Sequence, residues 1–102
     1  MAIFLYRLNP PRSTFPADIT AEEGAAMERH FGYWHDQMSR GSALVFGPVA
    51  DPQGAYGIAV LNVPNEAAAK AICTGDPAIT ARVGFTFKLY EMPNAVAKGA
   101  DA

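Results

Sequence analysis

His30 is the residue of this sequence best suited to acid–base chemistry. It lies in a segment where Met27, Phe31, Trp34 and Met38 follow one another at spacings of four, three and four, which predicts a helix that buries this apolar stripe. On a helical wheel His30 falls away from the centre of the stripe, at its rim. An imidazole there can face a cleft, and imidazole is the side chain that changes charge near neutral pH. The alternative is a hydrogen-bonded histidine that only borders the core.

Asp76 is the carboxylate that could partner such a histidine. In hydrolase triads a carboxylate orients the imidazole and stabilises its protonated form. Asp76 precedes Pro77 at a predicted helix start, where an Asp is also an ordinary N-cap that contributes about 1 kcal/mol. The two roles are compatible because a carboxylate has two oxygens.

Two proline-containing segments carry further charged residues. Arg12 follows Pro10-Pro11, and its guanidinium could pair with an anionic ligand, although a solvated loop arginine is the alternative. Residues 47–54 include Asp51 before Pro52. The length and stiffness of this segment are typical of a loop that lines a pocket, while turn formation explains the same residues equally well.

The sequence gives little support to metal or thiol chemistry. His35 falls on the opposite rim of the predicted helix, about 140° from His30, so the two cannot chelate one ion. The single cysteine, Cys73, excludes an internal disulfide and a multi-thiolate zinc site, and buried filler is its better interpretation. No nucleophile elbow, phosphate-binding loop or dinucleotide fingerprint is present. We therefore expect neither a metal nor a cofactor.

The elements that must position these residues follow a simple order. Thr20 and Glu23 form a capping-box pattern that opens the first helix, and Gly41 is placed to end it near Arg40. Asn65 is placed to cap a second helix, which is predicted to bury Ala68, Ala71 and Ile72. Strands are predicted at 2–8, 43–47, 56–63 and 85–90, and helices at 21–40 and 66–74, with a helical turn after Asp76. The order β-α-β-β-α-β predicts an α+β, ferredoxin-like domain with a four-stranded antiparallel sheet and both helices on one face.

The strands are apolar on both faces, which is unusual for a sheet covered on one side only. Ile3 and Leu5 alternate with Phe4 and Tyr6 in the first strand, and residues 56–63 show the same pattern. The chain has no further element to cover the second face. A homodimer with sheets packed face to face is the expected solution.

Length and charge exclude several classes of protein. A chain of 102 residues, half of them apolar, forms one domain with a real core. Eight basic and ten acidic residues give a net charge of −2, without the basic stripe of a nucleic-acid-binding protein. No apolar run approaches the ~20 residues of a membrane span, and the N-terminus lacks signal-peptide features. We expect a cytoplasmic protein, with a flexible C-terminal tail over 94–102.

With these residues placed, the chain resembles the YciI-like (YCII-related) family of the dimeric α+β barrel superfamily. The resemblance covers residues 1–93 and rests on the order and spacing of short motifs. These are the opening MAIFLYRL, the segment 28–34, Phe46-Gly47-Pro48, Asp76-Pro77 and the closing FTFKLYEMP. It implies a ferredoxin-like protomer, a homodimer and a His–Asp active site, which corresponds here to His30 and Asp76. One branch of the family is similar to a dehydrochlorinase that acts on a chlorinated hydroxyhydroquinone.

Two hypotheses of different classes follow for the function. The first is a small cofactor-independent enzyme in which His30 and Asp76 move a proton in an elimination or isomerisation of a small polar or aromatic metabolite. In this hypothesis the pocket is shaped by Arg12, Trp34, Phe46, Gly47, Pro48 and Asp51. The alternative is a non-catalytic dimeric module that binds or senses a small molecule; a purely structural interaction domain is a third, weaker option.

Overall fold

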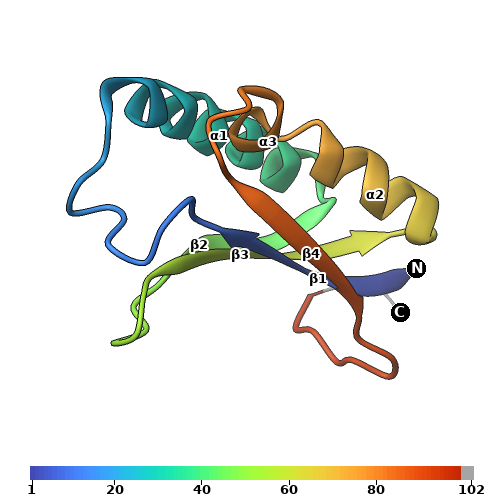
Figure 1. Cartoon of the computed structure of the whole chain (residues 1–102). Helices are drawn as coiled ribbons and strands as arrows, with labels where there is room; N and C mark the ends of the chain where they lie inside the picture. Colours follow the sequence, from blue (N-terminus) through green and yellow to red (C-terminus); the bar gives the residue numbers. More distant parts are fainter. Residues whose placement is uncertain (100–102) are drawn as a thin grey trace.

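The computed structural model describes residues 1–99 and confirms the predicted order of elements. Figure 1 shows one layer of helices lying over one layer of strands. The strands are β1 (Ala2–Asn9), β2 (Ala43–Val49), β3 (Tyr56–Val63) and β4 (Thr86–Glu91). The helices are α1 (Ala21–Arg40), α2 (Glu66–Thr74) and the single turn α3 (Pro77–Thr80). The protein therefore has the α+β, ferredoxin-like fold.

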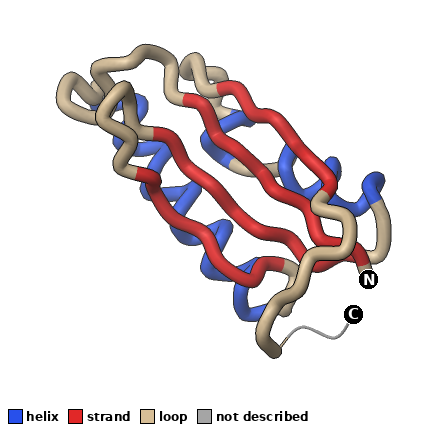
Figure 2. The backbone as a smooth tube through the Cα atoms, turned by 90° about the horizontal axis from the view of Figure 1, so that it is seen from below, coloured by secondary structure: helices blue, strands red, loops and turns tan. Residues whose placement is uncertain are grey.

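The four strands form one antiparallel sheet in the order β2-β3-β1-β4, and Figure 2 shows its helix-free face. β1 lies inside the sheet, where Tyr6 is opposite Ala59 of β3 and Leu89 of β4. Phe4, Tyr6 and Leu8 are buried under the helices. The residues of β1 that face the helices thus lie at the centre of the core.

β2 is longer than predicted because it includes Pro48 and Val49. A proline lacks the amide that a sheet interior requires, but β2 is an edge strand, where proline is tolerated. Pro48 is opposite Gly57 of β3. The connection between the two strands is therefore shorter than predicted, at residues 50–55.

The ends of α1 confirm the capping signals in the sequence. The Thr20 hydroxyl accepts a hydrogen bond from the Glu23 amide at 3.1 Å, and the Glu23 carboxylate accepts one from the Thr20 amide at 2.9 Å. Gly41 ends the helix with φ of 81°, a left-handed conformation that glycine adopts without strain. These local contacts fix where the helix begins and ends.

The predicted buried face of α1 was wrong in its orientation. Trp34 is fully buried, but Phe31 is 57% exposed and Met38 is 39% exposed. The buried residues of the helix are Glu23, Ala26, Trp34 and Gln37. On a helical wheel of 100° per residue, the centre of this buried set is rotated by about 70° from the centre of the predicted stripe. It coincides with the position of His30. His30 therefore projects from the middle of the inward face and not from its rim.

The second helical region also follows its caps, with one correction. Asn65 accepts a hydrogen bond from the Ala68 amide at 2.9 Å and opens α2 as predicted. The fully buried residues of α2 are Ala69 and Cys73, whereas Ala68 and Ile72 are half-buried and Ala71 is exposed. The inward face of α2 is thus rotated from the predicted one, and it places Cys73 over the sheet.

The helix-free face of the sheet carries several apolar side chains beside Arg7 and Lys88, and it is only partly covered. Ile3, Leu5 and Val60 are half-buried there, and Tyr90 is 46% exposed. Figure 1 shows the segment after β4 turning back beneath one end of this face. The last residues of the expected flexible tail, 100–102, lie outside the described residues.

Candidate functional site

The geometry of His30 and Asp76 brings together residues that are far apart in the sequence. Nδ1 of His30 lies 2.9 Å from each carboxylate oxygen of Asp76. His30 comes from the middle of α1, and Asp76 precedes α3, which packs against α1. The His30 side chain is 18% exposed, and that of Asp76 is fully buried. Only the histidine can therefore be reached from solvent.

Asp76 is held by three donors besides His30. Its Oδ2 atom accepts hydrogen bonds from the Tyr6 hydroxyl at 2.7 Å and from Nε1 of Trp34 at 2.8 Å. Its Oδ1 atom accepts one from the Ala78 amide at 2.9 Å, as expected of the N-cap of α3. The capping role and the contact with the imidazole thus coexist. Contacts from a strand and two helical segments fix the carboxylate in one position.

These donors keep Asp76 ionised although it is buried. Burial alone would raise the pKa of Asp76, but the hydrogen bonds and positive charge of His30, together with the bonds from Trp34 and Ala78, outweigh it and lower the pKa. Tyr6 is buried as well, and its burial together with the negative charge of Asp76 raises the pKa of its hydroxyl. The hydroxyl therefore remains protonated and donates to Asp76. The site thus holds one buried negative charge, directed at His30.

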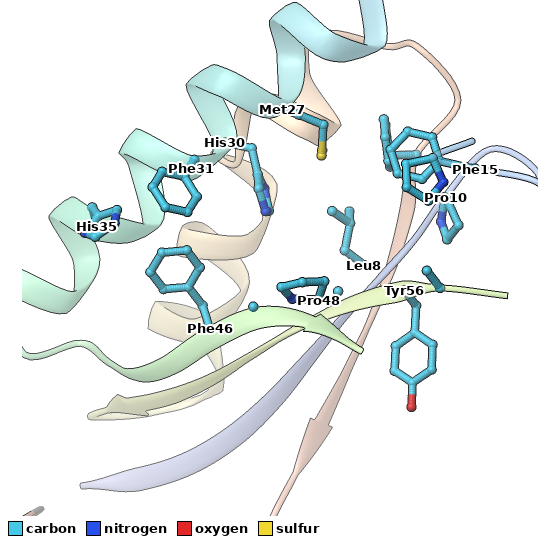
Figure 3. Close-up of a pocket in the computed structure, with 15 residues that line it drawn as sticks. Leu8, Pro10, Phe15, Met27, His30, Phe31, His35, Phe46, Pro48 and Tyr56 are labelled. Atoms are coloured by element: carbon cyan, nitrogen blue, oxygen red, sulfur yellow. The ribbon is translucent and has the colours of Figure 1, made fainter. Parts of the chain in front are cut away.

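The ionised carboxylate also determines the tautomer of the imidazole. A carboxylate can only accept, so Nδ1 of His30 must carry the hydrogen and donate it. In the neutral imidazole Nε2 then has a free lone pair. Figure 3 shows the His30 ring pointing from α1 into a cavity, with Met27 and Phe31 on either side of it along the helix. The arrangement presents a proton acceptor to whatever occupies the cavity.

The cavity has a volume of about 520 Å³ and lies between α1, the ends of β1, β2 and β3, and the loop after β1. Its walls are almost entirely apolar. The side chains and backbone that line it belong to Leu8, Pro10, Phe15, Pro16, Met27, His30, Phe31, His35, Phe46, Gly47, Pro48, Ala55, Tyr56, Gly57 and Phe85. Its size is that of a site for a small organic molecule.

Of the six residues expected to shape the pocket, the structure brings three to the wall of this cavity and a fourth to Asp76. Phe46, Gly47 and Pro48, at the end of β2, line it opposite His30. Trp34 is fully buried, is not among the residues that line the cavity, and donates a hydrogen bond to Asp76.

Arg12 and Asp51 lie elsewhere. Arg12 donates two hydrogen bonds to the Glu23 carboxylate, at 2.7 and 2.8 Å, and one at 2.9 Å to that of Asp18. It lines a second, smaller cavity of about 230 Å³. Arg12 thus fastens the loop after β1 to α1.

Asp51 is exposed, and it accepts a hydrogen bond from the Gln53 amide at 2.9 Å within its own turn.

Cys73 and His35 take no part in the contacts around Asp76. Burial and the nearby Asp76 charge raise the pKa of the Cys73 thiol to about 12, so this thiol is not a nucleophile at neutral pH. His35 is exposed and packs edge-on against Phe31 and Phe46 at the outer end of the cavity. Among residues 1–99, no three His, Cys, Asp or Glu side chains gather into a group that could hold a metal ion.

Sequence reasoning did not assign roles to Tyr6 or Phe15. Tyr6 holds Asp76, and Phe15 lines the cavity from the loop after β1. A signal for Tyr6 exists, since a tyrosine on the apolar face of a strand needs a hydrogen-bond partner when it is buried. Phe15 lies in an irregular loop, where no periodicity shows which side chain points inward.

The family model of the YCII-related domain matches residues 2–93, which spans every strand and helix described above. The chain belongs to the YCII-related domain family. A comparison with curated proteins found no match. The matched range includes both His30 and Asp76, so the paired residues of this YCII-related domain lie inside the family region. In the described part of the chain, 1–99, none of the helices has the length and apolar character needed to cross a membrane.

Proposed function

We propose that this YCII-related domain is a small cofactor-independent enzyme that uses His30 as its acid–base group. The observation that carries the proposal is the 2.9 Å contact between Nδ1 of His30 and the buried Asp76, on an imidazole that lines a cavity. A positioned base of this kind contributes about 10²–10⁴-fold to proton transfer. Asp76 holds the tautomer and stabilises the imidazolium that forms.

The reaction class is proton transfer that leads to isomerisation or elimination. Nε2 of His30 takes a proton from an acidic C–H or O–H bond of a small polar or aromatic molecule, and the bonding electron pair stays on the substrate. In an isomerisation the imidazolium returns the proton to another atom of the substrate. In an elimination a leaving group departs with its own bonding pair. Neither route requires an oxidant or a reductant.

Solvent exchange tests this proposal before the substrate is known. Small molecules with one acidic C–H hydrogen are incubated in D₂O with the wild-type protein, and deuterium incorporation at that carbon is followed by NMR. We expect His30→Gln to lower the catalysed rate by about 100-fold or more. Arg40→Gln is the control, because Arg40 is exposed at the end of the same helix and pairs with the exposed Asp36. Equal rates in the wild type and His30→Gln would contradict the proposal.

A non-catalytic binding module is the second candidate, and the apolar lining of the cavity favours it as much as it favours an enzyme. The two differ in what the imidazole does. An NMR titration in which His30 does not change protonation between about pH 5 and 8 would support the binding module, because a proton carrier must titrate.

The proposal also includes a second copy of the chain and a cytoplasmic location. The half-buried apolar side chains on the helix-free face, such as Leu5 and Val60, support packing of two sheets face to face. Sedimentation that gives a monomer at micromolar concentration would contradict the homodimer.

A further inference from the structure

Within residues 1–99, the main cavity is lined without the charged side chains that usually bind an anion or a cation. Of the residues that line it, all within the described range, none is Lys, Arg, Asp or Glu. Arg12 is the nearest candidate for an anion-binding group, but its guanidinium is occupied by Glu23 and Asp18. Arg7 lies on the helix-free face, where its guanidinium stacks 3.9 Å above the ring of Tyr56. The cavity therefore offers no arginine or lysine to a ligand.

The His30 imidazole does not replace such a cation. When it is protonated, its charge is already balanced by Asp76 at 2.9 Å, so the pair presents no net positive charge. His35, the other imidazole, lies at the outer end of the cavity against the rings of Phe31 and Phe46 (Figure 3). A carboxylate or phosphate that entered would lose its hydration without a compensating ion pair, which is unfavourable.

The walls are suited instead to a flat apolar body. Phe15 and Phe85 pack edge to face at one end of the cavity, with ring centroids 5.3 Å apart. Phe31 and Phe46 pack in the same manner at the other end, at 5.6 Å. Aromatic pairs of this geometry leave ring faces and edges to contact a third ring. His30 lies between Phe15 on one side and Phe31 and Phe46 on the other (Figure 3).

We propose that the natural ligand is an uncharged, largely apolar ring compound with one acidic hydrogen, which is directed at Nε2 of His30. The acidic hydrogen rests on the proposed function, whereas the neutral, apolar character rests on the cavity walls alone. The cavity selects against carboxylates and phosphates of the same shape.

A matched set of probes tests the charge preference. 2-Naphthol, 2-naphthoate and naphthalene share one ring system, and near neutral pH they are respectively uncharged with an acidic hydroxyl, anionic, and uncharged without one. Binding of each to the full chain is followed by probe fluorescence. We expect 2-naphthol to bind at least about tenfold more tightly than 2-naphthoate, since the anion is desolvated without a partner.

Phe31→Lys is the diagnostic variant. Phe31 lines the cavity but is 57% exposed, so a lysine there can be accommodated, and it adds the cation that the wall lacks. We expect it to reduce the preference for 2-naphthol over 2-naphthoate by about tenfold or to reverse it. The thermal midpoint of the variant is measured alongside, to establish that it folds.

Two results would overturn the inference. One is 2-naphthoate binding to the wild type as tightly as 2-naphthol, and the other is no binding of either uncharged probe at millimolar protein. Failure of the proposed function gives a different result: His30→Gln leaves deuterium exchange unchanged, while the preference for uncharged probes persists. The binding and exchange readouts therefore separate the two proposals.

Discussion

Nδ1 of His30 lies 2.9 Å from both oxygens of Asp76, a carboxylate that is itself fully buried and is shared with Tyr6, Trp34 and the Ala78 amide. One side chain thus caps α3, joins that turn to β1 and α1, and orients the imidazole. The free energy of unfolding and the protonation and tautomer of the proposed base therefore depend on the same carboxylate, so one variant can test both.

Asp76→Asn should damage both functions of this carboxylate. The side-chain amide of asparagine has one acceptor oxygen where the carboxylate has two, so at least one buried donor to Asp76 loses its partner. We expect the free energy of unfolding to fall by about 2–4 kcal/mol. ¹⁵N NMR of the imidazole should show that His30 no longer holds one tautomer. Asp51→Asn is the matched control, because Asp51 also precedes a proline but is exposed, and it should change stability by less than about 0.5 kcal/mol. Equal losses in urea unfolding would refute the central role of Asp76.

Tyr6→Phe should remove one hydrogen bond without opening a cavity. The 2.7 Å bond to Asp76 is buried, so its loss should cost about 1–2 kcal/mol in urea unfolding. The pKa of Asp76 should rise, because one donor to its charged form is gone. Tyr90→Phe, at an exposed position of β4, serves as the control. If the two variants were equally stable, the Tyr6 hydroxyl would have no structural role.

Acid should destabilise the protein through Glu23 and Asp76. Hydrogen bonds from Arg12 and from the Thr20 amide lower the pKa of Glu23 from its ordinary value of 4.5 to about 2. Because the folded-state pKa lies below the unfolded one, this stabilisation is fully present above pH 4.5 and is lost as the pH falls towards 2. The pKa of Asp76 is also lowered, so it contributes with the same sign. Thermal midpoints measured from neutral to acid pH should fall steeply in the wild type and less steeply in Glu23→Gln; parallel curves would exclude Glu23 as a source.

Arg12→Ala should free the loop that carries Phe15 to the cavity. Arg12 fastens residues 10–20 to α1 through Glu23 and holds the loop itself together through Asp18. Without it, limited proteolysis in this loop should become several-fold faster, and 2-naphthol should bind more weakly because one apolar wall is no longer held in place. Arg40→Ala removes an exposed ion pair of the same helix and should change neither measurement. Unchanged proteolysis in Arg12→Ala would mean that other contacts hold the loop.

The sequence by itself determined the features that depend on neighbouring residues. Thr20 with Glu23, Asn65 and Gly41 mark helix ends through hydrogen bonds or backbone angles that span only a few residues. Asp76 before Pro77 was recognisable as a cap for the same reason. Strand alternation placed Phe4, Tyr6 and Leu8 on one face, and that face is the buried one. The ferredoxin-like order followed from these elements and their lengths.

Only the tertiary structure decided which face of α1 points inward and what surrounds Asp76. Apolarity favoured the stripe through Phe31 and Met38, but Glu23 and Gln37 are buried because side chains outside the helix satisfy them: Arg12 in one case, and the Ser42 hydroxyl in the other. The same rotation brings His30 to Asp76, 46 positions away, and Tyr6 to Asp76, 70 positions away. Such contacts depend on how the chain packs, since the free energy of burying a polar group is set by partners that local sequence does not contain.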